Sequence, residues 1–215
     1  MSEDLLGRIA DALLHGSVVT IEVSLGALAI AMLIGLVLAT TEHLSDNRAA
    51  AFLIRAYVEA LRNVPSLTFL FLLYFGLASA GLRMSSMVAA ILGLGMIGGA
   101  VVVDILRAGF QSVPTGQNEA AAAIGLRPLP AFRLVVLPQG LRLALPSLGN
   151  YAVGLVKDTS LVAAIAAPEV MFNARQIVNE TFATATIYGA AALLYLLLTF
   201  VVGQAFVLAE RRLEY

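Results

Sequence analysis

Two long stretches of this chain carry no charged side chain: Met84 to Val103 and Phe182 to Ala209. The hydrocarbon core of a bilayer is about 30 Å thick, so a helix needs roughly 20 apolar residues to cross it. Both stretches meet that requirement. The composition agrees, since 60% of the 215 residues are hydrophobic and 13% are charged, against roughly 25% charged in an ordinary soluble domain. The sequence therefore predicts an integral membrane protein.

Three further stretches approach the length of a membrane span, which makes five expected spans at residues 17–41, 51–77, 84–106, 143–168 and 183–209. The second is the weakest, because its uncharged part begins only at Pro65 and the amphipathic residues 51–63 must supply the rest. Pro65 predicts a kink in that span. We therefore expect an all-α fold with five transmembrane helices over residues 17–209. An unrepeated set of five spans is expected to form half of a pore, whose other half comes from a second chain.

Five spans put the two ends of the chain on opposite sides of the membrane, and the distribution of arginine predicts which side is which. With the N-terminus outside, nine arginine residues lie on the cytoplasmic side: Arg48, Arg55, Arg62, Arg107, Arg127, Arg133, Arg142, Arg211 and Arg212. Three lie outside: Arg8, Arg83 and Arg175. Residues 210–215 are then a cytoplasmic tail. Residues 1–16 are expected to form an extracytoplasmic interfacial segment, with one apolar face made by Leu5, Ile9, Ala12 and Leu13.

The connection between the third and fourth expected spans is long for a segment without a function. Its first part, Gln117 to Ile124, is strongly helix-forming. Gly125 suits the left-handed position that follows a helix. A second short helix is expected from Ala131 to Val136, ending before Pro138. Two short helices joined by a glycine bend would make a compact docking surface at the cytoplasmic face.

The centre of this connection resembles the EAA signature of ABC importer permeases. The resemblance is carried by EAAAAIG at residues 119–125 and, after it, by Phe132, Leu137, Pro138 and Pro146. Small alanine side chains allow a helix to approach a partner groove closely, and the glycine bend fixes its register.

Further motifs are similar to those of the polar amino-acid permeases of the histidine, arginine, glutamine and glutamate type. They are RNVPSL at 62–67 with YFGL at 74–77, GGA at 98–100 followed by Asp104 and Arg107, QSVPTGQ at 111–117, and LVKDTSL at 155–161. The resemblance covers roughly residues 15–210. It departs from that family at Asp104, where Glu is frequent, and at Asn63, where Gly is common.

The resemblance implies the architecture of a type I ABC importer permease in a bacterial inner membrane. In that family the loop at residues 107–142 forms coupling helices that sit in a groove on the ATPase subunit. That role falls here on Glu119, Ala120, Ala121, Gly125 and Pro138. The implied partners are a cytoplasmic ATPase dimer, a second permease chain, identical or paralogous, an extracytoplasmic substrate-binding protein and membrane lipid. ATP and Mg²⁺ are expected on the partner ATPase, and no cofactor is expected in this chain.

Several other functions lack support. Gly93 to Gly98 spells a dinucleotide-binding fingerprint, but no strand precedes it, and the spacing of Gly95 and Gly99 instead favours close packing of membrane helices. No phosphate-binding loop ending in Lys-Ser or Lys-Thr occurs. His15 and His43 have no clustered ligands and cysteine is absent, so neither a metal site nor catalysis is expected. A net charge of −1 does not indicate nucleic-acid binding.

Ionisable side chains within a membrane are costly and usually functional. We expect the substrate pathway to involve Glu59, Lys157, Asp158, Thr159 and Ser160. If the fourth span begins near Pro146, Lys157 lies about 16 Å along it, close to the middle of the membrane. Adjacent cationic and anionic groups suit a zwitterionic amino acid. The alternative is that Lys157 and Asp158 only fasten two permease chains together.

Two further pairs of charged residues lie three positions apart, a spacing that allows ion pairs on one helix. They are Glu59 with Arg62, and Asp104 with Arg107. Both are expected to anchor or fasten helices.

The function that these features favour is transport: a permease that moves polar amino acids across the inner membrane, with energy supplied by a partner ATPase through the loop. Two alternatives stay open. The same architecture would serve an opine or another small polar solute, and a membrane scaffold or sensor would conduct no solute at all.

Overall fold

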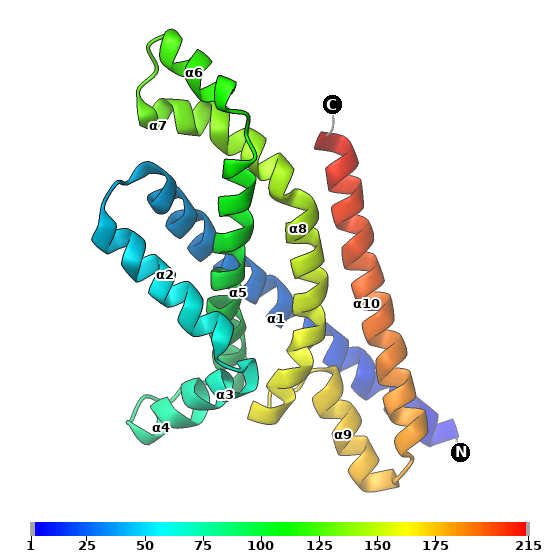
Figure 1. The fold of residues 1–215 in the computed structure, drawn as a ribbon. Coiled ribbons are helices and arrows are strands. Elements are labelled where there is room, and N and C mark those ends of the chain that lie inside the picture. The colour runs from blue at the N-terminus through cyan, green and yellow to red at the C-terminus, as the bar shows by residue number, and fades with distance from the viewer. Residues whose placement is uncertain (1–2, 214–215) are drawn as a thin grey trace.

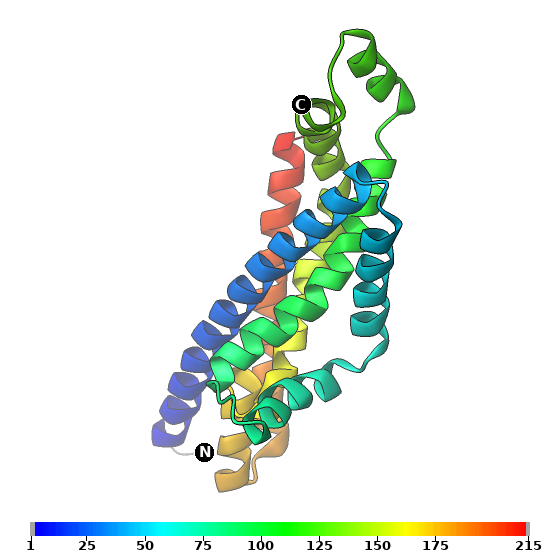
Figure 2. The ribbon, with the colours of Figure 1, turned by 90° about the vertical axis from the view of Figure 1, so that its left-hand side faces the viewer.

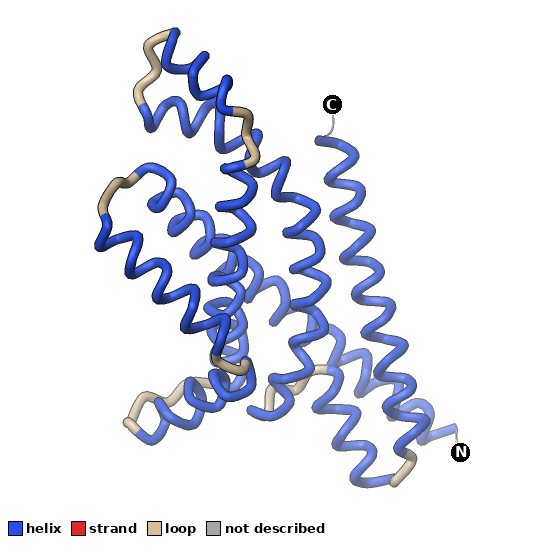
Figure 3. The backbone as a smooth tube through the Cα atoms, viewed as in Figure 1, coloured by secondary structure: helices blue, strands red, loops and turns tan. Residues whose placement is uncertain are grey.

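The computed structural model describes residues 3–213, and every regular element in that part of the chain is a helix (Figures 1 and 3). The molecule is elongated. Helix α1 begins at one end of it, and the last helix, α10, finishes at the other (Figure 1). The described part of the chain therefore confirms the expected all-α fold.

Helix α1 runs without a break from Glu3 to Leu44. The expected interfacial segment at residues 1–16 is therefore continuous with the first expected span and stays a prediction; residues 1 and 2 lie outside the described part. Ile9 and Leu13 are buried against α9, and Gly16 lets α1 approach the backbone of Val170 closely. The apolar face at the start of α1 packs on protein because it has a helical partner.

The second expected span is not a single kinked helix. Helix α2 (Arg48–Asn63) is followed by α3 (Ser66–Phe71), the π-helical turn η1 (Leu72–Gly76) and α4 (Leu77–Ser79), and the two parts meet at a bend of 104°. The break falls at Val64, which is extended. A residue before proline is pushed out of the helical region, and Pro65 itself has no N–H to donate.

Helix α5 (Ser86–Gln111) lies at the centre of the molecule and packs against α1, α2 and α8. Its glycines allow this close packing, as the sequence predicts. A Cβ built on Gly95 would lie 2.8 Å from Ile30 of α1, and one on Gly99 would lie 2.7 Å from Ile34. Such contacts fit only glycine, so α1 and α5 are fastened by close backbone approach.

After α5 the chain forms α6 (Thr115–Ala123) and then a long helical run made of α7 (Pro128–Ala131), the π-helical turn η2 (Phe132–Val136) and α8 (Leu137–Asp158). The expectation of a short helix that stops before Pro138 is therefore wrong. Pro138 is the second residue after the π-helical turn, and the rearranged hydrogen bonds of such a turn accommodate a residue without an N–H. The fourth span does not begin at Pro146 either, because that residue lies inside α8.

Helix α8 ends at Asp158, so the expected span 143–168 is also too long. The chain continues through the 3-10 helix η3 (Thr159–Ile165), α9 (Val170–Thr181) and α10 (Thr184–Leu213), which returns along α8. Three of the described helices, α1, α5 and α10, are long and apolar enough to cross a membrane, and the bent α2–α3 pair would make a fourth. The expected count of five spans is not confirmed, since α8 carries too many polar residues to count as a helix apolar enough to cross a membrane.

Candidate functional site

The loop between α5 and α8 projects beyond the rest of the molecule at the end where α10 finishes (Figures 1 and 2). Gly125 has φ +80°, so the sequence-based expectation of a left-handed residue here is confirmed. Its N–H donates to the Ala122 carbonyl at 2.9 Å, and the Leu126 N–H donates to the Ala121 carbonyl at 3.0 Å. These two bonds close the end of α6 in the manner of a Schellman motif.

Part of the outer surface of this loop is apolar. Ile124, Leu129 and Leu134 are between 61% and 76% exposed, and a hollow lined by Leu129, Pro130, Arg133 and Leu134 lies beside them. Of the expected coupling residues, Glu119, Ala120, Gly125 and Pro138 are exposed, and Ala121 is buried. Large apolar side chains exposed together on a polar protrusion indicate a protein contact.

The base of the loop is held in place by side chains that the sequence did not single out. Phe110 of α5 and Phe132 of η2 stack edge to face, with ring centroids 5.2 Å apart. His43, at the end of α1, lies 5.1 Å from the Phe132 ring. The amide of Gln139 donates to Gln117 at 3.3 Å, which ties α6 to α8. The loop is thus anchored to three helices.

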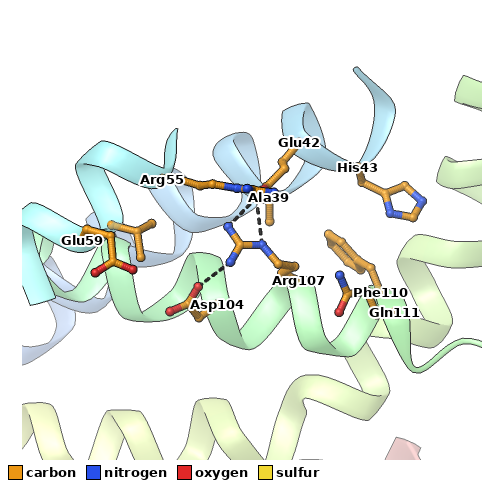
Figure 4. A pocket seen from close by; sticks show the side chains of 10 residues that line it. Ala39, Glu42, His43, Arg55, Glu59, Asp104, Arg107, Phe110 and Gln111 are labelled. Carbon is orange, nitrogen blue, oxygen red and sulfur yellow. Dashed lines mark hydrogen bonds and ion pairs between the residues drawn. The ribbon is translucent and has the colours of Figure 1, made fainter. Parts of the chain in front are cut away.

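A chain of ion pairs connects α1, α2 and α5 below the loop (Figure 4). The expected pair of Asp104 and Arg107 is formed, with 2.8 Å between Oδ1 and Nη1. Arg107 also donates from Nε to Glu42 at 2.8 Å. Arg62 donates to Asp104. The expected pair of Glu59 and Arg62 is therefore wrong, because Arg62 turns toward α5.

Glu59 instead accepts a hydrogen bond from the Asn63 side chain at 2.9 Å. It lines a cavity of about 580 Å³ between α1, α2 and α5, together with Glu42, His43, Arg55, Asp104 and Arg107 (Figure 4). No α8 residue lines that cavity. The structure thus separates Glu59 from the other expected pathway residues, which lie at the far end of α8 and in η3.

Those other residues differ in exposure. Lys157 and Asp158 are exposed at the end of α8, Ser160 is half-buried, and Thr159 is buried. The Thr159 hydroxyl donates to the Val156 carbonyl at 2.7 Å, so its proton is already used in a hydrogen bond within the helix. Lys157 lies 20 residues beyond Leu137, about 30 Å along the helix. The expected depth of Lys157, which assumed a start at Pro146, is not supported.

Three further residues of a polar face on α8 were not predicted from the sequence. Ser147, Asn150 and Gly154 precede Asp158 at intervals of three and four residues, which places all four on one face of α8. Ser147 and Asn150 are exposed and Gly154 is half-buried. Helical periodicity of polar residues in an otherwise apolar helix was the signal that would have identified them. Such a face avoids lipid and lies against water or protein.

A buried carboxylate fastens the opposite end of the molecule. Glu169 is fully buried, accepts from the Phe172 N–H at 2.7 Å as the N-cap of α9, and accepts from the Tyr195 hydroxyl of α10. Arg175 donates to the Ala163 carbonyl at 3.3 Å. These contacts hold η3, α9 and α10 together beyond the end of α8.

Comparisons with known proteins agree with this arrangement. Residues 31–215 match the family described as "binding-protein-dependent transport system inner membrane component". The chain is 37% identical to a probable glutamine ABC transporter permease (GlnM) of Bacillus subtilis, over 74% of each chain. It is 34% identical to the histidine/lysine/arginine/ornithine permease HisQ of Salmonella typhimurium, over 97% of this chain and 96% of that one.

Solved structures give the same result. A crystal structure of an amino acid ABC transporter with histidines matches with a TM-score of 0.88 at 30% identity, covering 99% of this chain and 100% of that one. An inward-facing methionine ABC transporter, MetNI, matches with a TM-score of 0.84 at 20% identity and 99% coverage of both chains. The second likeness concerns the fold alone.

Proposed function

Since this chain belongs to the family of binding-protein-dependent transport system inner membrane components, we propose that it moves polar amino acids through a pathway lined by the polar face of α8. The chain is the permease subunit of an ABC importer and a multi-pass protein of the inner membrane. It is not an enzyme, because ATP is hydrolysed by a separate subunit. Its partners include that ATPase and a substrate-binding protein.

One observation carries the proposed mechanism: a single helical run joins the exposed apolar loop to the polar face. From Pro128 to Asp158 the chain is continuously helical, and 30 residues of helix extend about 45 Å. A helix is stiff along its axis, so a displacement of α7 by a docked ATPase moves Lys157 and Asp158 as well. Glu119, Ala120, Ala121, Gly125 and Pro138 are the proposed ATPase-coupling residues at the near end of this run.

The proposed substrate contacts lie at the far end. Lys157 and Asp158 expose a cation and an anion next to each other, and an amino acid carries a carboxylate and an ammonium group. Asn150 adds a polar group on the face of α8 that carries Asp158, and Ser160 follows Asp158 by two residues in η3. Glu59, on α2, is proposed to face the solute nearer the cytoplasm, because it lies in the cavity with the ion pairs and not beside Lys157.

The proposed orientation places the start of α1 outside and the end of α10 in the cytoplasm. The arginine distribution supports it, and the structure gathers the segments expected in the cytoplasm at one end: the α1–α2 connection, the loop and the end of α10 (Figure 1). We further propose that two permease chains enclose the pathway, and that ATP and Mg²⁺ bind the ATPase subunits and not this chain.

The experiment that tests the proposal is solute-stimulated ATP hydrolysis. The permease is purified with the ATPase encoded beside it, reconstituted in lipid, and mixed with its binding protein preloaded with glutamine, histidine, arginine or nopaline in separate reactions. A permease raises ATP hydrolysis with at least one loaded binding protein above the level seen with the empty one. A complex that forms and hydrolyses ATP at the same rate under all conditions would contradict transport and favour a scaffold.

A further inference from the structure

One buried hydroxyl group has no hydrogen-bond partner among the described residues: that of Tyr151, on α8. It lies against Gly98 of α5, so closely that a Cβ built on that glycine would overlap it. Buried hydroxyl groups are nearly always paired, because an unpaired one loses its hydrogen bonds to water without replacement. The hydroxyl of Tyr151 therefore costs stability in this arrangement of the helices.

A second tyrosine reaches the same turn of α5 from the other side. Tyr57 of α2 donates its hydroxyl to the Met96 carbonyl at 2.6 Å, and a Cβ built on Gly99 would lie 2.7 Å from its oxygen. A phenol oxygen that donates its proton still has lone pairs to accept one. Tyr57 therefore has unused acceptor capacity on the same turn of α5 that Tyr151 contacts.

The contact between α5 and α8 is closest where glycine and alanine meet, next to Phe110, which packs on Gly140. A Cβ built on Gly109 of α5 would lie 2.6 Å from the Gly140 carbonyl oxygen of α8 and 2.9 Å from Ala144. Backbones that meet across glycine and alanine have shallow ridges, so a small shear of α8 along α5 is resisted mainly by the larger side chains beside them, such as Phe110. Because α8 continues from the loop, such a shear is the motion that a docked ATPase would impose.

From these three observations we infer that Tyr151 is a positioning residue of the transport cycle, whose hydroxyl donates to the Tyr57 oxygen when α8 is displaced along α5. The displaced arrangement then contains a chain of hydrogen bonds from Tyr151 to Tyr57 to the Met96 carbonyl. The arrangement seen here lacks the first of these bonds. The unpaired hydroxyl raises the free energy of the resting arrangement, and the new bond lowers that of the displaced one.

This inference rests on the proposed transport function and is tested with a double-mutant cycle. The variants are Tyr151→Phe, Tyr57→Phe and the double variant, with Tyr188→Phe of α10 as a matched control away from the α5–α8 contact. Each is reconstituted with the ATPase and binding protein. Thermal unfolding, turnover and the half-saturating concentration of loaded binding protein are measured for each.

The expected results separate the resting arrangement from the displaced one. Tyr151→Phe melts at or above the wild-type temperature, because it loses an unpaired group, yet its turnover falls roughly two- to tenfold, the worth of one hydrogen bond. Tyr57→Phe melts lower, because it loses the bond to Met96. The half-saturating concentration stays unchanged in both. The double variant turns over no more slowly than the slower single variant, since both singles break the same bond.

Three results would each overturn the inference: a lower melting temperature for Tyr151→Phe, an unchanged turnover for that variant, or turnover losses that multiply in the double variant. Failure of the wild-type complex to transport any solute would count against the proposed function alone. The melting comparison requires no transport and would still decide whether the Tyr151 hydroxyl is unpaired.

Discussion

Arg62, in the last turn of α2, donates a hydrogen bond to the carboxylate of Asp104 on α5. The same carboxylate accepts from Arg107 at 2.8 Å, which in turn holds Glu42 of α1. Arg62 lies just before the 104° bend that separates α2 from α3. The ion pair thus fixes the end of α2 at the point where the chain changes direction, and it ties three helices together on the side of the loop.

Replacing Asp104 by Asn is expected to destabilise the permease by about 1–2 kcal/mol, between the values for an exposed and a buried ion pair. The side chain of Asp104 is 27% exposed. Its loss leaves the guanidinium group of Arg62 without an anion, while Arg107 keeps Glu42. Thermal unfolding in detergent measures the effect. Asp46→Asn is the control, because Asp46 is exposed and makes no ion pair among the described residues. Equal melting temperatures for both variants would show that this network of ion pairs does not stabilise the permease.

Replacing Gly125 by Val is expected to leave the permease inserted but to abolish most of the solute-stimulated ATP hydrolysis. A left-handed backbone costs a β-branched residue about 1–2 kcal/mol, so the end of α6 unwinds and the apolar surface of the loop loses its shape. Gly189→Val of α10 is the control, since both glycines have open space around a built Cβ but only Gly125 has positive φ. Wild-type stimulation in Gly125→Val would show that this bend plays no part in coupling.

The roles of Lys157 and Asp158 are separated by comparing Lys157→Met with Asp158→Asn. Both side chains are exposed in the single chain, which leaves them free to contact the solute or a second permease chain. We expect transport to fall at least tenfold in Asp158→Asn while the permease pair and basal ATP hydrolysis persist. Size-exclusion chromatography and uptake assays give the two readouts. Dissociation of the pair in both variants would assign these residues to the interface between chains.

The orientation in the membrane is tested with protease. A tag after Tyr215 is expected to be protected in intact cells, and a tag before Ser2 is expected to be cut, because the arginine-rich ends of the helices stay in the cytoplasm. Permeabilised cells, in which both tags are cut, are the control. Cleavage of the C-terminal tag in intact cells would reverse the proposed topology.

The sequence allowed correct prediction of features that depend on local chemistry. Uncharged stretches marked α5 and α10, and Gly125 marked the end of α6, because only glycine takes positive φ without cost. The close contacts of Gly95 and Gly99 with α1 followed from their spacing in an apolar helix. In each case the cause lies within a few residues of the effect.

Features that depend on distant partners were not predictable in the same way. Arg62 had two candidate anions, and the choice of Asp104 over Glu59 depends on how α2 packs on α5. The packing of Ile9 and Leu13 against α9 could not be predicted either, because α9 lies more than 150 residues later in the sequence. Pro138 was read as a helix end because a π-helical turn, which accommodates it, has no recognisable sequence pattern.

The most direct test of the central claim is ATP-dependent uptake of a labelled polar amino acid by liposomes that contain the permease, its ATPase and its binding protein. We predict accumulation that requires ATP and the binding protein, that is blocked by excess unlabelled solute, and that is lost in Asp158→Asn although the complex stays intact. Solute entry at the same rate without ATP would contradict the transport function. So would the absence of any polar amino-acid uptake by a complex whose ATP hydrolysis responds to the loaded binding protein.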